Sequence, residues 1–141
     1  MIIGQSTTCT CRTLNTFSVA LQELSRVLTK VSTLQLEPGR INGSVVKTSV
    51  GCLELFKIES NLPIQIVGDL DQTKVVFCIE LAREKRSWNH SCNGSEFERP
   101  HLCGFNWHLQ NLDLKLAAGT RMCLILIDKL TLCRWMATQS P

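Results

Sequence analysis

The apolar residues of this chain follow a helical spacing near the N-terminus and an alternating spacing further along. Between residues 16 and 33 they recur every three or four positions, with Gln22, Glu23 and Arg26 between them. Such a stripe covers one face of an α-helix, so the pattern predicts an amphipathic helix over residues 16–33. The stripe consists of Phe17, Ala20, Leu21, Leu24, Val27, Leu28 and Val31.

From Asn42-Gly43 onwards, apolar and polar residues alternate in short segments that are separated by turn residues. A period of two is typical of strands with one buried face. We expect the segments on either side of the turn at residues 117–120 to pair as a hairpin. The predicted strands lie within residues 50–58, 64–66, 75–81, 105–109, 112–116, 122–127 and 130–135.

These elements predict an α+β or mostly β fold, in which one N-terminal amphipathic helix packs on an antiparallel sheet of about five to seven strands. The 141 residues are expected to form a single domain, 1–141. Within it, residues 1–14 form an extended arm, and the polar residues 83–104 form a long loop.

Eight cysteines add a second source of stability to this picture. Their even number suits complete pairing into four disulfides, which would make the fold disulfide-stabilised. Connectivity cannot be read from the sequence, but Cys78 and Cys123 stand in apolar runs and are expected to be buried. The eight are Cys9, Cys11, Cys52, Cys78, Cys92, Cys103, Cys123 and Cys133.

Three Asn-X-Ser sequons begin at Asn42, Asn89 and Asn93. Sequons are glycosylated only in the secretory pathway, and disulfides persist in the same oxidising compartments. Both features predict a secreted glycoprotein. The residues after Met1 lack a basic and a long apolar region, so we expect a signal peptide to have been removed; the alternative is a cytosolic protein. No apolar run approaches the length of a transmembrane helix.

Charge and motifs exclude several classes of function. A net charge of +3 without a basic stripe argues against nucleic-acid binding. No Gly-X-Ser-X-Gly elbow or calcium loop is present, so no catalytic residue or cofactor is assigned. The pairs His90-X-Cys92 and His101-X-Cys103 leave zinc as an alternative use of these side chains, and Cys103 with His101 or His108 as a nucleophile and its base.

Arg83-Glu84-Lys85-Arg86 resembles the Arg-X-Lys-Arg site that secretory proprotein convertases cleave. Its place in a polar loop favours access by a protease. The resemblance implies that Arg83, Lys85 and Arg86 direct cleavage after Arg86. The alternative is an ordinary solvated, charged turn.

The function that the sequence favours is a non-enzymatic, extracellular protein-binding or structural module, with a protein partner and with homo-oligomerisation left open. One alternative is a carrier of a lipid or another hydrophobic ligand, because apolar strands under a helix can enclose a cavity. A second alternative is a small zinc-binding protein or hydrolase.

Overall fold

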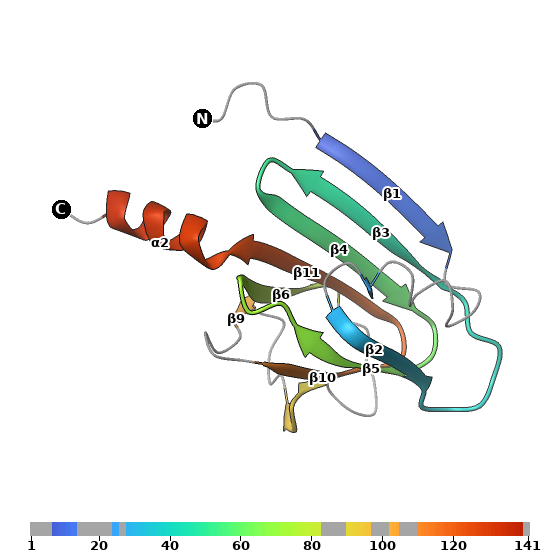
Figure 1. The fold of residues 1–141 in the computed structure, drawn as a ribbon. Helices are drawn as coiled ribbons and strands as arrows, with labels where there is room; N and C mark the ends of the chain where they lie inside the picture. The colour runs from blue at the N-terminus through green and yellow to red at the C-terminus, as the bar shows by residue number, and fades with distance from the viewer. Residues whose placement is uncertain are drawn as a thin grey trace.

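The computed structural model describes residues 7–13, 24–25, 28–82, 90–96, 102–104 and 110–139 of the chain. They form a sandwich of two antiparallel sheets with one helix at the C-terminal end (Figure 1). The six-stranded sheet has the order β1 (Thr7–Thr13), β3 (Gly43–Val50), β4 (Leu53–Ser60), β11 (Thr120–Asp128), β6 (Lys74–Ala82) and β9 (Leu102–Gly104). The five-stranded sheet has the order β2 (Leu28–Gln35), β5 (Ile64–Leu70), β10 (Asn111–Leu116), β7 (Ser91–Cys92) and β8 (Ser95–Glu96).

The core lies between the two sheets and comes from the alternation that the sequence displays. In β5 and β10 every second side chain is buried, and β4 and β11 supply buried side chains from the opposite sheet. Alternate residues of a strand share one face, so each of these strands turns its apolar set toward the other sheet. The most deeply buried large side chains include Phe56, Ile58, Ile66, Leu112, Leu114, Leu116, Met122 and Leu126.

Strands are confirmed within residues 50–58, 64–66, 75–81, 112–116 and 122–127, but their pairing is not the one expected. The predicted strand at 105–109 lies outside the described residues. The turn after β10 carries the chain from the five-stranded sheet to the six-stranded sheet, and β10 pairs with β5 and β7 instead of β11. The predicted hairpin around residues 117–120 is therefore wrong. Both strands have a strict period of two because each faces the same core from opposite sides.

The predicted N-terminal helix over residues 16–33 is not supported, because Leu28–Gln35 is strand β2; of the predicted stripe, Leu24 is helical and buried. Residues 14–23 lie outside the described part of the chain. The register of β2 against β5 shifts between Thr29 and Ser32, and Lys30 has a φ of 51°. Across this irregularity Leu28 and Val31 are three positions apart, so an interrupted strand imitates helical spacing.

The predicted arm and loop contain further strands. The arm includes β1, which pairs along its whole length with β3. The loop at 83–104 includes the β7–β8 hairpin, and its turn is Asn93-Gly94, with φ values of 49° and 84°. Positive φ at both central residues is the geometry that an Asn-Gly hairpin turn adopts without strain.

A buried polar cluster joins the two sheets near β7. His90, which is 1% exposed, places Nε2 2.9 Å from Oε1 of Glu80 on β6. The backbone N–H of Ala117 donates to His90 Nδ1 over 3.0 Å. Since Nδ1 accepts that bond, the ring proton is on Nε2 and is donated to Glu80. His90 thus supplies a donor to the buried Glu80 side chain and an acceptor to the backbone N–H of Ala117, directly after β10.

Candidate protein-binding surface

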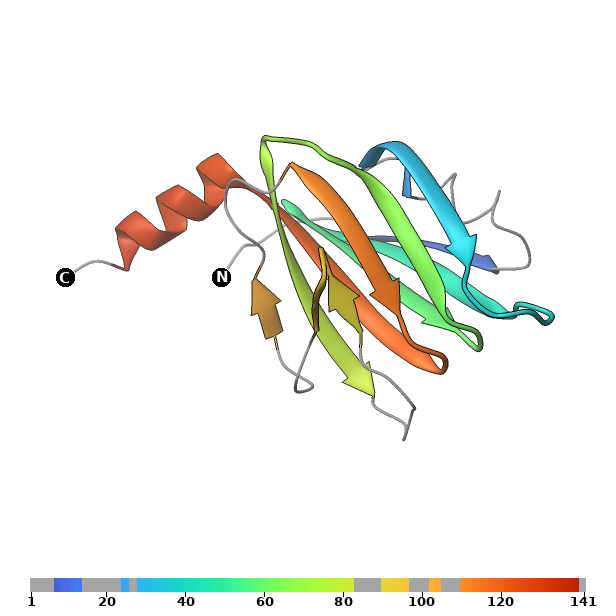
Figure 2. The same cartoon turned by 90° about the horizontal axis from the view of Figure 1, so that it is seen from below.

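The C-terminal segment forms helix α2 (Lys129–Thr138), where the sequence pattern predicted a strand over residues 130–135. It begins directly after β11 ends at Asp128 and extends away from the sandwich (Figures 1 and 2). None of its residues is buried. Leu, Met, Ala, Lys and Arg favour helix, and a lone extended segment would have no neighbouring strand to pair with.

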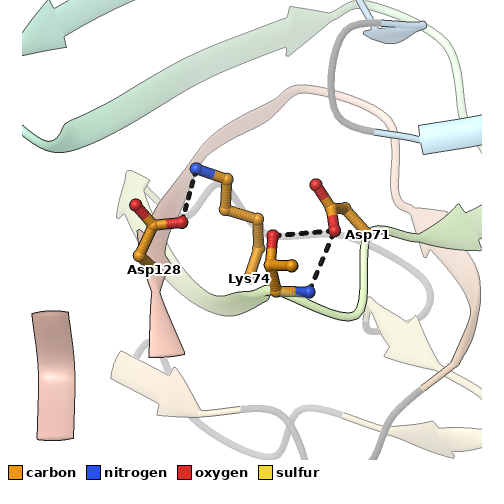
Figure 3. Close-up of polar contacts among 4 residues, drawn as sticks. Asp71, Lys74 and Asp128 are labelled. Atoms are coloured by element: carbon orange, nitrogen blue, oxygen red, sulfur yellow. Dashed lines mark hydrogen bonds and ion pairs between the residues drawn. The ribbon is translucent and has the colours of Figure 1, made fainter. Parts of the chain in front are cut away.

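The junction between β11 and α2 is held by contacts with the β5–β6 turn (Figure 3). The Lys74 ammonium lies 2.9 Å from Asp128 Oδ1. The backbone N–H of Lys129 donates to Thr73 O over 2.8 Å. Asp71 Oδ1 in turn accepts bonds from the backbone N–H and the hydroxyl of Thr73, at 2.9 and 2.8 Å. These bonds fix the direction in which α2 leaves the sandwich.

Two charged groups of the junction, Asp71 and Lys74, have shifted pKa values. The two hydrogen bonds from Thr73 stabilise the Asp71 carboxylate and lower its pKa below 3.8. The hydrogen bond to Asp128 stabilises the Lys74 ammonium and raises its pKa above 10.5. Both groups are therefore charged at neutral pH, and the electrostatic part of the junction is intact there.

Apolar side chains cover most of the surface of α2. At about 100° per residue, its apolar residues span roughly 220° of the circumference. Leu130 and Met136 are 63% and 61% exposed, and Trp135 is 39% exposed. Arg134 and the two threonines occupy the remaining arc, and Lys129, in the first turn, lies within the apolar arc. The apolar residues of the helix are Leu130, Leu132, Cys133, Trp135, Met136 and Ala137.

The outward face of the six-stranded sheet is a second apolar surface. The register places Ile125 of β11 beside Leu55 of β4 and Phe77 of β6, and all three are partly exposed. Among the described residues, no helix or strand lies across this face (Figures 1 and 2). Its partly exposed apolar residues include Val46, Val50, Leu53, Leu55, Phe77, Ile79, Cys123 and Ile125. Val75 and Ile127, which share this face next to α2, are buried.

Charged residues limit this outward face at the end that is far from α2. Glu59 Oε1 lies 2.9 Å from Lys57 Nζ and 3.7 Å from Arg121 Nε. Cys123 stands between this group and Ile125, and partial burial raises the pKa of its thiol. The face therefore divides into an apolar half near α2 and a charged half at the start of β11.

The predicted sites for zinc and for a hydrophobic ligand gain no support. In the described part of the chain, no three His, Cys, Asp or Glu side chains are grouped so as to hold a metal ion. His90 uses both ring nitrogens within the core. His101 and His108 lie outside the described residues.

Two hollows on the described surface could hold a small ligand, and both open to solvent. One, of about 570 Å³, lies at the base of α2 and is lined by Leu130, Arg134 and three neighbours. The other, of about 420 Å³, lies at the opposite end of β11 and is lined mainly by polar residues such as Asn61 and Thr120. Neither is an enclosed apolar cavity of the kind that a lipid carrier uses.

The cysteines do not give the disulfide-stabilised fold that their number predicts. No disulfide joins any two of the cysteines whose side chains are described, and Cys52, Cys123 and Cys133 are free thiols. Cys78 is buried as predicted, whereas Cys123 is only half-buried. Cys9 and Cys11 belong to β1, and Cys103 stands opposite Cys78 in the β6–β9 register. The packed core therefore carries the fold without disulfides among these residues.

The sequons occupy different structural settings. Asn42 is exposed and directly precedes β3. Asn93 is exposed too, but its Nδ2 donates to Asn111 O over 2.8 Å and its Oδ1 accepts from the Asp113 N–H. Asn89 and the cleavage motif with Arg83, Lys85 and Arg86 lie outside the described residues. Geometry thus favours Asn42 as a glycan acceptor and gives Asn93 a structural role.

Comparison with protein-family models, with curated proteins and with solved structures gave no match. No helix in the described ranges combines the length and the apolar character needed to cross a membrane.

Proposed function

We propose that this protein is a non-enzymatic β-sandwich that binds another protein through α2 and the apolar half of the outward face. The observation that carries the proposal is a helix of 10 residues with no buried residue, although most of its surface is apolar. An isolated helix of fewer than about 12 residues is marginal in water, and helices usually gain stability by packing their apolar side. A partner would supply that packing.

The distribution of residues around α2 favours a protein partner over a membrane surface. A helix that lies on a membrane has one apolar face and a polar face rich in Lys and Arg. In α2 the apolar residues extend over roughly 220°, and the polar arc holds Arg134 and two threonines. A helix with this distribution suits a groove or a layer of side chains that contacts it on several sides.

Export and glycosylation are part of the proposal and rest on the sequons. Asn42 supports them, because it is exposed at the start of β3 and accessible to a glycan. Cys52, Cys123 and Cys133 are free thiols and add no support for an oxidising compartment. This part of the proposal therefore rests on the sequons.

Site-specific photo-crosslinking tests the protein-binding surface. A benzophenone amino acid would replace Met136 on the apolar side of α2 and, as a matched control, Thr138 on its polar arc. In protein from a eukaryotic secretory host, we expect discrete protein adducts from position 136 and few from position 138. Absence of protein adducts from position 136, or equal yields from both positions, would contradict the proposal.

A further inference from the structure

We infer that the protein partner is a second copy of this chain, in a two-fold dimer in which each α2 packs on the outward face of the other copy. This inference rests on the proposed function, because it identifies the partner of the same surface. The chain carries both halves of such a contact, an unpacked apolar helix and an apolar sheet face of the kind that helices cover.

Helix α2 does not extend over the outward face of the six-stranded sheet in its own copy. The helix starts at Lys129 without an intervening loop, and its backbone is bonded to Thr73. The ion pair between Lys74 and Asp128 holds the same junction. As a result, α2 extends past the end of β11 and away from the sheet (Figures 1 and 2).

The direction of α2 allows a two-fold symmetric contact. Consider a two-fold axis that lies beside the junction, parallel to the sheet and perpendicular to β11. Rotation about it makes β11 and α2 of the second copy antiparallel to those of the first and turns the two outward faces toward each other. It places the second sheet over the first α2 and the second α2 over the first sheet. Both contacts are identical, as a closed two-fold interface requires.

The length of α2 matches the length of the apolar surface. A helix of 10 residues is about 15 Å long, which equals about four or five residues of a strand. Counted back from Asp128, that distance covers Ile125 and the adjacent Leu55 and Phe77, while Ile127, which is nearer to the helix, is already buried in its own copy. The charged group around Glu59 begins just beyond it.

The area that a stable dimer needs also favours the two-fold arrangement. Stable interfaces bury about 800 Å² per partner. One aromatic side chain buries roughly 150–250 Å², so a short helix on a single face falls well short of that area. In the two-fold arrangement each copy contributes one helix and one face, and each surface needs to supply only about 400 Å². Leu130, Trp135 and Met136 are the exposed large side chains that α2 contributes to this area.

Sedimentation of the full-length chain over a range of concentrations tests the inference. We expect the wild-type protein to form dimers. Met136→Glu on the helix and Ile125→Lys on the face should each raise the dissociation constant more than roughly 100-fold, since each change occurs twice in the dimer. Thr138→Glu, which adds the same charge on the polar arc of α2, should leave the dimer intact.

A mixture of the two disruptive variants separates this arrangement from other dimers. The Met136→Glu chain keeps a normal face and the Ile125→Lys chain keeps a normal helix, so one of the two contacts can form between them. We expect the mixture to associate more tightly than either variant alone and more weakly than the wild type. A dimer built from helix–helix or face–face contacts would show no such rescue, and that result would overturn the inference.

Circular dichroism and thermal melts establish that each variant is folded, and Leu55→Lys replaces Ile125→Lys if the latter does not fold. A wild-type chain that stays monomeric at every concentration would also overturn the inference. If position 136 still crosslinks to a different protein, the proposed function stands and only the second copy is excluded. If position 136 crosslinks to no protein, the proposed function fails as well.

Discussion

Replacement of His90 by alanine should be among the most destabilising single changes in the core. His90 is 1% exposed, and the side chain of Glu80 is 4% exposed. The change removes the donor at Glu80 and the acceptor of the Ala117 N–H together. A buried polar group that loses its hydrogen-bond partner costs about 1–3 kcal/mol, and more when it is charged, and this change affects two such groups. A typical domain has only about 5–15 kcal/mol of stability, so the effect should be large.

Glu80→Gln provides the matched control. The glutamine Oε1 can still accept the Nε2–H of His90, so the bond persists without the charge. Neutral hydrogen bonds contribute about 0.5–1.5 kcal/mol and charged ones about 1.5–3 kcal/mol, which predicts a loss near 1 kcal/mol. Urea denaturation, followed by circular dichroism and tryptophan fluorescence, measures both free energies of unfolding. A cost below about 1 kcal/mol for His90→Ala, or equal costs for both variants, would refute the assigned pairing.

Three further predictions concern acid sensitivity, glycosylation and packing. Because the pKa of Asp71 is lowered from 3.8 in the folded state, its contribution to stability should be present above pH 3.8 and be lost as the pH falls through its folded pKa. Urea melts of the wild type and of Asp71→Ala should accordingly converge in acid; a constant difference would count against the contribution of the charge. Glycopeptide mapping should find Asn42 occupied and Asn93 bare, because both amide atoms of Asn93 bond to the backbone of β10; the reverse occupancy would contradict this reading. Leu114→Ala, at a side chain that is 0% exposed, should cost about 2–5 kcal/mol, whereas the exposed Lys115→Ala should change the free energy of unfolding by less than about 0.5 kcal/mol.

The sequence predicted strands reliably where one face is buried and the turn residues are clear. Period-two alternation identified β4, β5 and β10, which bury alternate side chains in the core. Continuous apolar runs identified β6 and β11. The same alternation says nothing about which strands pair. It therefore could not reveal that β10 and β11 belong to different sheets.

The helix prediction is wrong over residues 28–33 for a local reason. The spacing of Leu28 and Val31 has the period of a helix, yet it arises from the irregularity around Lys30 in an edge strand. A shift of this kind depends on pairing with β5, which a local pattern does not contain.

The sequence analysis missed α2 because apolar and polar residues alternate over its first turn, which predicted a strand. Leu130 and Leu132 are separated by Thr131, which imitates a strand, and only the helix-forming residues that follow pointed the other way. The outward face was missed because the apolar residues of β6 and β11 were all assigned to a core. In the structure one half of each set, such as Phe77 and Ile125, faces outward.

No residue of α2 is buried against its own chain, and amide hydrogen exchange tests directly whether the helix gains stability from intramolecular packing. The protein would be diluted until sedimentation shows only monomers. We predict that the amides of α2 then exchange far faster than those of β10 and β11, because a short helix without packing opens readily. Protection of α2 comparable to that of the core strands in the monomer would show that the helix is packed within its own chain and would contradict the account.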